Sequence, residues 1–255
     1  AAVKAVTDAE ADTGNAINLD TDFTATVSDN GSAAASDLSS ISGKTAGLIT
    51  ATSVTTLTGT ASEIATLISD EADSGNGVNL AANVAATVTG NVAAADLTTI
   101  NNGTTGLITA TGVTTITGTA AAVKAVIDAE ADTGNAINLD TDFDVTITPA
   151  GTAAATDLST INTETSGLVT ATNVTNISGT VAAVKAVTDA EGDTGNAINL
   201  DSDFTITLAT GEAAVTDLSA LNTATNGNID AQNITALTGT AAAVNTFITT
   251  EESDA

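Results

Sequence analysis

Residues 189–204 read DAEGDTGNAINLDSDF, and this stretch decides the fold because it recurs along the chain. Residues 8–23 and 128–143 both read DAEADTGNAINLDTDF, and residues 69–84 read SDEADSGNGVNLAANV. The leucine of the N-L pair falls at positions 19, 80, 139 and 200, so consecutive copies are 61, 59 and 61 residues apart. The spacing predicts an architecture of four repeats of about 60 residues.

A second string recurs between these acidic stretches. It reads DLSSISGKTAGLITATSVTTLTGT from Asp37, and related strings begin at Asp96, Asp157 and Asp217. Each repeat therefore has two halves of about 30 residues that share one plan, in which Gly-Thr-Ala precedes an Ala-rich segment, a polar turn and a β-branched stretch. We call them the acidic half-repeat and the threonine half-repeat.

We predict a single continuous repeat array over residues 1–255. The expected repeats are approximately 1–60, 61–119, 120–180 and 181–240, with the start of a fifth at 241–255.

Local patterns predict one short helix and about one strand in each half-repeat. Thr119 and Thr180 stand where helix N-caps are expected, and residues 60–63, TASE, form a capping box. Apolar side chains alternate over residues 17–27, which is the period of a strand. Glycines after the acidic helices are expected to end them, namely Gly14, Gly75, Gly134 and Gly195.

A helix–strand unit of about 30 residues cannot bury its apolar face alone, so neighbouring units must stack. We predict an α/β solenoid of about eight such coils, with a mainly parallel sheet and helices along its opposite side. With four Phe and no Trp, Tyr or Met, the core must consist of thin layers of Ala, Val, Ile and Leu. The alternative is a string of β-sandwich domains, which need about seven strands per hundred residues.

The amino-acid composition argues against several classes of function. The net charge of −27 predicts that the chain binds neither nucleic acid nor anionic membranes. No apolar run approaches the 18 or more residues of a membrane span, so no membrane insertion is expected. The chain has no His, Cys, Arg or Tyr, which removes most nucleophiles, bases and oxyanion stabilisers. We therefore expect no enzyme.

The acidic stretch is the candidate metal site, because its oxygens are the hard ligands that calcium takes in sixes to eights. The predicted calcium ligands are Asp12, Asn15, Asp20, Asp22, Asp132, Asn135, Asp140, Asp142, Asp193, Asn196, Asp201 and Asp203. The second repeat has Ala81 and Asn83 at the last two of these positions, which argues against an obligatory site there. The alternative is a solvated helix end whose Asp and Asn side chains cap their own backbone.

Three further residue types recur. Asp37 and its equivalents form either an acidic row or early-helix carboxylates that the helix dipole favours. The phenylalanines are expected in the core. Rows of threonine suit either an ice-binding face or ordinary polar strand positions. The pairs are Thr50 and Thr52, Thr109 and Thr111, and Thr170 and Thr172, and Asp230 and Gln232 break the rows in the fourth repeat.

The string V-T-x-[LI]-[TS]-G-T-A occurs at residues 54–61 and 113–120, each time after an Asp-Leu-x-x-Ile segment. In this it resembles the repeat regions of very large exported surface proteins of marine bacteria and cyanobacteria, some labelled haemolysin-type calcium-binding. The resemblance covers essentially the whole chain and implies a cell-surface or extracellular location. The GGxGxD nonapeptide that binds calcium in that group is absent here, so none of its calcium residues is carried over.

We expect a structural extracellular protein, a segment of a filament, surface layer or adhesin stalk. The alternative is an adhesin module that recognises glycan, the cell envelope or another surface through a repeated face. Because both termini fall within a repeat, we expect self-association or continuation into further repeats. Calcium is the one cofactor expected.

Overall fold

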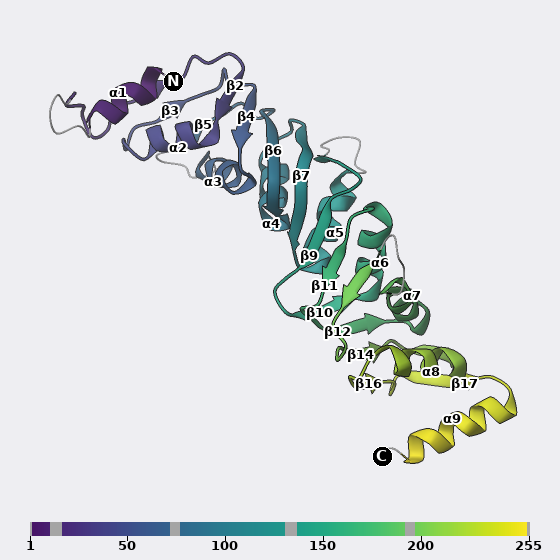
Figure 1. Cartoon of the computed structure of the whole chain (residues 1–255). Helices are drawn as coiled ribbons and strands as arrows, with labels where there is room; N and C mark the ends of the chain where they lie inside the picture. The colour runs from purple at the N-terminus through teal and green to yellow at the C-terminus, as the bar shows by residue number, and fades with distance from the viewer. Residues whose placement is uncertain (1, 11–16, 72–76, 131–136, 192–196, 254–255) are drawn as a thin grey trace. The chain divides into compact units, whose positions relative to one another are not determined.

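The computed structural model describes residues 2–10, 17–71, 77–130, 137–191 and 197–253. Helices and strands alternate along the chain (Figure 1), so the fold is α/β, as predicted. The chain divides into two compact units. The N-terminal unit comprises residues 1–115 and 125–140, and the C-terminal unit comprises residues 116–124 and 141–255.

The first thirteen elements cover the first two repeats and the start of the third. They are α1 (Ala2–Glu10), β1 (Ala25–Thr26), β2 (Ser32–Ala34), α2 (Ala35–Ser42), β3 (Ile49–Thr50), β4 (Thr56–Gly59), α3 (Ala61–Glu71), β5 (Val78–Asn79), β6 (Ala85–Ala93), α4 (Ala94–Gly103), β7 (Ile108–Gly118), α5 (Ala120–Glu130) and β8 (Ile137–Leu139).

The remaining elements cover the rest of the described chain. They are β9 (Asp144–Ile147), β10 (Gly151–Ala154), α6 (Ala155–Glu164), β11 (Val169–Ala171), β12 (Val174–Gly179), α7 (Val181–Glu191), β13 (Ile198–Leu200), β14 (Thr205–Leu208), β15 (Gly211–Ala214), α8 (Val215–Ala224), β16 (Ile229–Asp230), β17 (Ile234–Thr238) and α9 (Ala241–Ser253).

Strands of the N-terminal unit pair in parallel. One sheet has the order β1-β3-β5, with Ile49 of β3 opposite Val78 of β5. In another, β4 lies between β2 and β6, with Leu57 of β4 opposite Ala86 of β6. β7 lies beside β6 and pairs in parallel with β8. The parallel pairing agrees with the sequence prediction.

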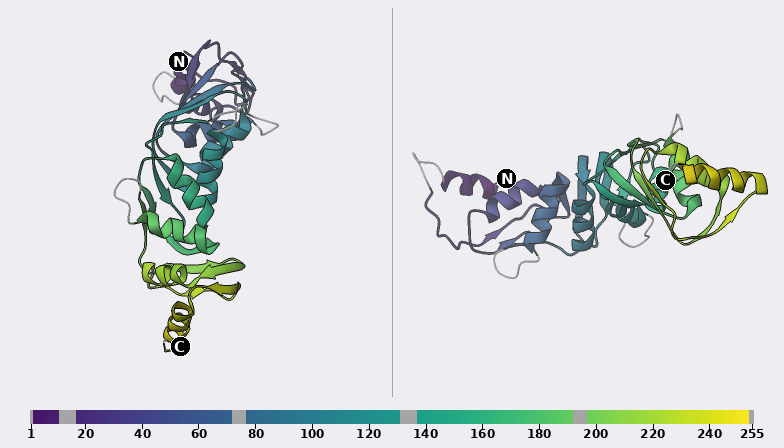
Figure 2. Two further views of the ribbon diagram at one scale, coloured as in Figure 1. Left: turned by 90° about the vertical axis from the view of Figure 1, so that its right-hand side faces the viewer. Right: turned by 90° about the horizontal axis from the view of Figure 1, so that it is seen from below.

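The C-terminal unit repeats this arrangement. β11 pairs in parallel with β9 and β13, and β12 pairs in parallel with β10 and β14. β14 also pairs with β16, where Ile206 is opposite Ile229. β15 pairs with β17. Neighbouring strands in the sheets of this unit are therefore every second strand in the sequence, and Figure 2 shows the ribbon from two further sides.

Consecutive helices also pack side by side. In the N-terminal unit α1 contacts α2, α2 contacts α3 and α3 contacts α4, and in the C-terminal unit α6, α7, α8 and α9 follow the same order. Helices also pack on strands of their own half-repeat, as α3 does on β6 and α6 does on β12. Within each unit, successive helices thus lie next to one another, as successive parallel strands do.

The prediction of about one strand per half-repeat is wrong. In the fourth repeat the acidic half has β13 and β14, and the threonine half has β15, β16 and β17. Neighbouring strands lie about 4.8 Å apart but packed helices about 8–10 Å apart, so two helices need more than two strands of one sheet beside them. β14 supplies the extra strand, because it pairs with β12 on one side and β16 on the other.

The expected continuous strand after each acidic stretch is likewise broken. In the fourth repeat a turn separates Leu200, the last residue of β13, from Thr205, the first residue of β14. The alternation of apolar residues remains, since Ile198, Leu200, Phe204 and Ile206 are all buried. The turn leads the chain from β13 in one sheet to β14 in another, and it keeps the apolar side chains of both strands in the core.

The core consists of alternate strand residues and one face of the helices α2 to α8. Phe143 and Phe204 are each 1% exposed, which confirms their expected core position. Phe23 and Phe247, which belong to the first and last helix–strand layers, are half-buried. Leu158 of α6 is buried within the C-terminal unit. Small aliphatic residues supply the rest of the core, as the composition requires.

Helix starts agree with the sequence. Thr60 and Glu63 form the expected capping box: the Glu63 N–H donates to Thr60 Oγ1 at 3.2 Å, and the Thr60 N–H donates to Glu63 Oε2 at 2.9 Å. Thr119 and Thr180 accept from the backbone three residues later. Asp37, Asp96, Asp157 and Asp217 stand in the first turns of α2, α4, α6 and α8. Gly14, Gly75, Gly134 and Gly195 lie outside the described residues.

We expect Thr60→Ala to lower the free energy of unfolding by about 1 kcal/mol, because it removes the hydroxyl that caps α3. Urea denaturation followed by circular dichroism measures this change. Ser62→Ala is the matched control, since it removes an exposed hydroxyl from the same helical turn and leaves the capping box intact. Equal losses in the two variants would contradict the role of the cap.

Candidate functional site: the strand-entry turn and the docking loop

The candidate calcium ligands belong to two groups. Asp12, Asn15, Asp132, Asn135, Asp193 and Asn196 lie outside the described residues. Asp20, Asp22, Asp140, Asp142, Asp201 and Asp203 are described, and all six are exposed. They belong to a turn that leads into β1, β9 or β14. We call residues 20–23, 81–84, 140–143 and 201–204 the strand-entry turns.

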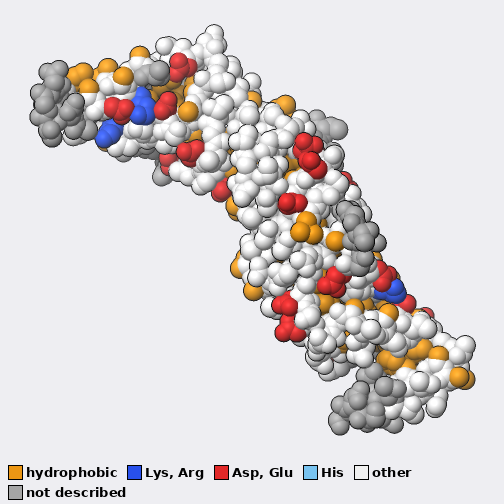
Figure 3. All heavy atoms as spheres, in the orientation of Figure 1, with side chains coloured by type: hydrophobic (Ala, Val, Ile, Leu, Met, Phe, Trp, Pro, Cys, Tyr) orange, Lys and Arg blue, Asp and Glu red, His pale blue; other side chains and the backbone are white. Residues whose placement is uncertain are grey.

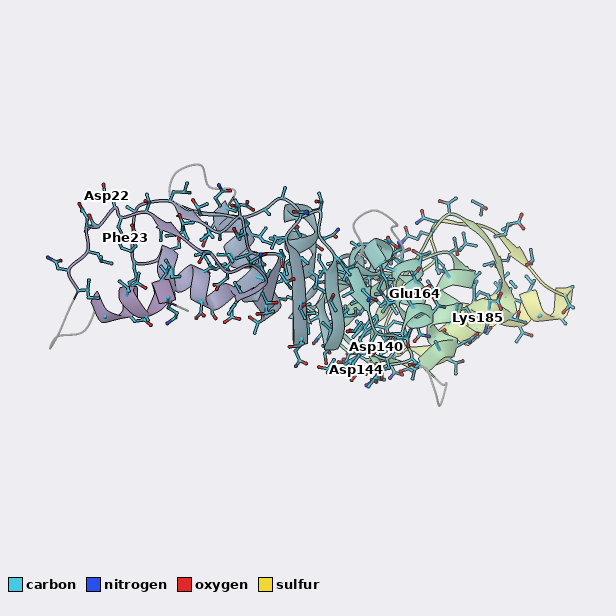
Figure 4. All side chains as sticks on the ribbon, turned by 90° about the horizontal axis from the view of Figure 1, so that it is seen from above. Asp22, Phe23, Asp140, Asp144, Glu164 and Lys185 are labelled. Atoms are coloured by element: carbon cyan, nitrogen blue, oxygen red, sulfur yellow. The ribbon has the colours of Figure 1, made fainter. Side chains whose placement is uncertain are left out.

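The first carboxylate of the turn caps its own backbone in two copies. Asp20 Oδ1 accepts from the N–H of Thr21 at 2.8 Å, and Asp201 Oδ1 accepts from the N–H of Ser202 at 2.7 Å. The second carboxylate points outward, as Figure 4 shows for Asp22, whereas the neighbouring Phe23 turns inward. These contacts are the ones expected of a self-capping solvated turn.

A glutamate at the end of the preceding helix also has a backbone partner. Glu71 Oε1 of α3 accepts from the N–H of Leu80 at 3.1 Å. In the fourth repeat Glu191 of α7 bonds to the backbone of Leu200. Desolvation raises the pKa of Glu191 above its ordinary value of 4.5, and the Leu200 hydrogen bond acts in the opposite direction. This carboxylate therefore ties the helix end to the strand beyond it.

Each strand-entry turn contacts a loop of the following threonine half-repeat. We call residues 45–47, 104–106, 165–167 and 225–227 the docking loops. The carbonyl of the second turn residue accepts a backbone N–H from this loop in all four repeats, at 2.7–2.9 Å. The pairs, carbonyl first, are Thr21 with Ala46, Ala82 with Thr105, Thr141 with Ser166 and Ser202 with Asn226.

A threonine hydroxyl makes the second link. Thr165 Oγ1 donates to the carbonyl of Phe143 and accepts from the N–H of Gly167 at 3.0 Å. The same pair of bonds recurs in the other three repeats, through Thr45, Thr104 and Thr225. Thr104, Thr165 and Thr225 are at most 7% exposed. The buried hydroxyl thus satisfies a carbonyl of one half-repeat and an N–H of the next.

A glycine allows this close approach. A Cβ added at Gly167 would lie closer than 3.0 Å to the carbonyl oxygen of Phe143, and one at Gly227 would overlap the carbonyl oxygen of Phe204 in the same way. Gly47 and Gly106 face the equivalent carbonyls of the first and second repeats. The docking loop therefore needs the sequence Thr-x-Gly, with threonine for the hydrogen bonds and glycine for the space.

The second repeat shows that the geometry of the strand-entry turn does not depend on its charge. Ala81 and Asn83 replace both carboxylates there. The turn still closes, with the N–H of Val84 donating to the carbonyl of Ala81 at 2.9 Å, and it still accepts both bonds from its docking loop. Backbone groups and the loop threonine therefore hold this turn in place without carboxylates.

The docking loop was not predicted from the sequence, although its sequence pattern recurs. Thr-x-Gly recurs at positions 45, 104, 165 and 225, once in each repeat. It was hidden because threonine is also an ordinary polar strand residue, and because glycine in a polar segment is typical of any turn. Burial of the threonines distinguishes them from the exposed Thr52, Thr111 and Thr172.

Asp144 makes a further link between half-repeats, since its Oδ1 accepts from the N–H of Leu168 at 2.8 Å. Among the described residues no three acidic side chains lie close enough together to hold a metal ion. Calcium binding through the candidate ligands stays a prediction, because half of those ligands lie outside the described part of the chain.

Surface charge is almost entirely acidic, as the face in Figure 3 illustrates. Two lysines pair with aspartates one helical turn away: Lys4 Nζ lies 2.7 Å from Asp8 Oδ2, and Lys185 Nζ lies 2.6 Å from Asp189 Oδ2. Both hydrogen bonds raise the pKa of the lysine. The remaining carboxylates on this surface leave it strongly anionic.

Comparison of the chain with family models, with curated proteins and with solved structures gives no match. Within the described ranges no helix is both long and apolar enough to cross a membrane.

We expect Gly167→Ala to destabilise the protein by about 2–3 kcal/mol, because the methyl group overlaps the Phe143 carbonyl and pushes the docking loop from the turn. Gly151→Ala is the matched control, since a Cβ there meets nothing within 4 Å. Urea denaturation of both variants measures the difference. A loss in Gly167→Ala no larger than in the control would contradict the proposed contact.

We expect Thr165→Val to cost about 1–3 kcal/mol, because an isosteric methyl leaves the buried Phe143 carbonyl and the Gly167 N–H without this partner. Thr165→Ser keeps the hydroxyl and should retain most of the stability. Thermal unfolding of the two variants checks the order. Serine behaving like valine would show that packing of the methyl group, rather than the hydroxyl, is decisive.

For calcium, we expect chelation to lower the melting temperature and calcium to restore it. The measurement is differential scanning calorimetry at physiological salt, with magnesium at equal ionic strength as the control for charge screening. The double variant Asp140→Asn with Asp142→Asn copies the uncharged turn of the second repeat and should reduce the calcium effect. Identical melts with calcium and with chelator would rule out a stabilising site.

Proposed function

We propose that this chain is a structural repeat protein: an α/β solenoid of about eight coils of about 30 residues, in four repeats of about 60. Its role is that of a segment of an extracellular filament, surface layer or adhesin stalk. The observation that carries the proposal is the link between strand-entry turn and docking loop, which is present in all four repeats. This link joins the two half-repeats of each repeat, which is the contact that a stacked structure requires.

Two other observations support a passive, exposed role. Exposed carboxylates surround a core of small aliphatic residues, and a net charge of −27 keeps such a protein soluble and repels other anionic surfaces. The sequence contains no His, Cys, Arg or Tyr, the residues that most catalytic sites use. The resemblance to repeat regions of exported surface proteins points to the same location.

The alternative is an adhesin module, and one observation favours it. Thr52, Thr111 and Thr172 are exposed and stand at the same position in three successive repeats, beside the half-buried Thr50, Thr109 and Thr170. Such a face would recognise glycan or another surface. Binding to a glycan array that is lost on changing the exposed threonines to lysine would favour this function over the passive scaffold.

Small-angle scattering and surface labelling test the structural proposal together. A compact chain of 255 residues has a radius of gyration of about 18 Å, and a solenoid of the same length should give a clearly larger value. Antibodies against this chain should also label the exterior of intact source cells. A compact particle, or label confined to permeabilised cells, would overturn the proposal.

A further inference from the structure

Asn-Gly pairs are the most reactive dipeptides of this chain, and three of them lie within the described residues. The backbone nitrogen that follows an asparagine can attack the side-chain amide, and a glycine in that position, without Cβ, crowds the approach least. The same dipeptide occurs in three different environments, so the structure determines which copy can react. The three pairs are Asn30-Gly31, Asn102-Gly103 and Asn226-Gly227.

Asn30-Gly31 lies in an open connector between β1 and β2. Asn30 is exposed, and a Cβ added at Gly31 would meet nothing within 4 Å. The carbonyl of Gly31 accepts from the N–H groups of Thr55 and Thr56 at 2.9 and 3.2 Å, but the N–H of Gly31 has no hydrogen-bond partner among the described residues. The nitrogen that must attack is therefore accessible, and the amide of Asn30 has room to turn toward it.

The accessibility of this connector does not depend on its place in the first repeat. The β9–β10 and β14–β15 connectors of the third and fourth repeats carry Ala150-Gly151 and Thr210-Gly211 at the same position. Ala150 and Thr210 are exposed as Asn30 is, and a Cβ at Gly151 or Gly211 would again meet nothing within 4 Å. Both repeats follow another repeat in the chain, so a preceding repeat leaves this connector open.

Asn226-Gly227, by contrast, is held by the contact between docking loop and strand-entry turn. The N–H of Gly227 donates to Thr225 Oγ1 at 2.9 Å, and the N–H of Asn226 donates to the carbonyl of Ser202 at 2.8 Å. A Cβ at Gly227 would overlap the carbonyl oxygen of Phe204, so the glycine is also closely packed. The nitrogen of Gly227 can attack only after this contact opens.

Asn102-Gly103 is held by a helix. Gly103 is the last residue of α4, and a Cβ added there would overlap the side chain of Ile68 in α3. A helical backbone fixes the dihedral angles of Asn102 and engages N–H groups with carbonyls four residues earlier. This pair therefore also needs local opening before it can react.

We propose that Asn30 is a site of spontaneous deamidation and that the fold protects Asn102 and Asn226 from the same reaction. The nitrogen of Gly31 loses its proton to water or hydroxide and forms a bond to Cγ of Asn30, while the side-chain nitrogen takes up a proton and leaves as ammonia. Water then opens the five-membered succinimide at either carbonyl, which gives aspartate or isoaspartate. This inference is independent of the proposed function.

The two products differ in their effect on the pairing of β2 with β4. Isoaspartate adds a methylene group to the backbone directly before Gly31, whose carbonyl accepts from the backbone of Thr55 and Thr56 and from Thr55 Oγ1 at 3.2 Å. Aspartate leaves the backbone unchanged and adds a charge at an exposed position. We therefore expect isoaspartate at position 30 to lower the melting temperature more than the Asn30→Asp variant does.

Peptide mapping of the folded chain after storage at mildly alkaline pH tests the proposal. Cleavage after lysine places Asn30 in residues 5–44 and Asn226 in residues 186–255, and neither fragment has another Asn-Gly pair. Asn102 shares residues 45–124 with Asn76, which lies outside the described residues, and fragmentation in the mass spectrometer separates these two. We expect Asn30 to convert at least about tenfold faster than Asn102 and Asn226, because both need local opening first.

Two controls show whether the fold sets the difference. In guanidinium chloride all three pairs are released, so their rates should become similar. In the folded chain Thr225→Val removes the acceptor of the Gly227 N–H and should speed conversion of Asn226 without changing Asn30, whereas Thr225→Ser keeps the hydroxyl and should stay slow. Melting curves confirm that both variants are folded, and the comparison of folded with unfolded wild type does not depend on them.

Three results would overturn the proposal. They are an unchanged Asn30 in the folded chain, conversion of Asn102 or Asn226 as fast as that of Asn30, and the same difference in rates in the unfolded chain. A folded Thr225→Val variant in which Asn226 stays slow would refute the protective role of the hydroxyl.

Discussion

The hydroxyl of the docking-loop threonine is the interaction on which the stacking of half-repeats depends. It lies where two layers of backbone meet, and it satisfies the Phe143 carbonyl and the Gly167 N–H together. Without it, the free energy needed to bury these two groups would oppose stacking. Because the glycine lets the backbones approach and the threonine hydroxyl reaches the carbonyls of Thr141 and Phe143 in one strand-entry turn, the contact also fixes the position of each half-repeat against the next.

This short-range link explains how a chain with a net charge of −27 can stack at all. The carboxylates of the strand-entry turns are exposed, while the groups that join the layers are neutral and largely buried. Exposed charges are screened by salt over about 8–10 Å, whereas buried hydrogen bonds are not. The charged carboxylates and the backbone carbonyls that join the half-repeats are thus different groups of the same turn. The second repeat can therefore lose both carboxylates and keep its geometry.

Features that depend on a few neighbouring residues could be predicted from the sequence. The capping box at Thr60 and Glu63, the helix near Leu38 and the core position of Phe204 all follow from local spacing. The second strand of the acidic half-repeat and the docking loop could not. The strand follows from the different widths of helices and strands, and the loop from contact between residues more than twenty positions apart, such as Thr165 and Phe143.

Two identical stretches show how much of the structure the neighbours decide. Residues 8–23 and 128–143 have the same sequence, yet Ile137–Leu139 forms β8 while residues 17–19 form no strand. Phe143 is 1% exposed and Phe23 only half-buried. Since sequence is constant, the difference arises from the preceding half-repeat: β8 pairs with β7, and the first half-repeat has no such neighbour among the described residues. Strand formation here therefore depends on the neighbouring half-repeat, which supplies the strand with which the next one pairs.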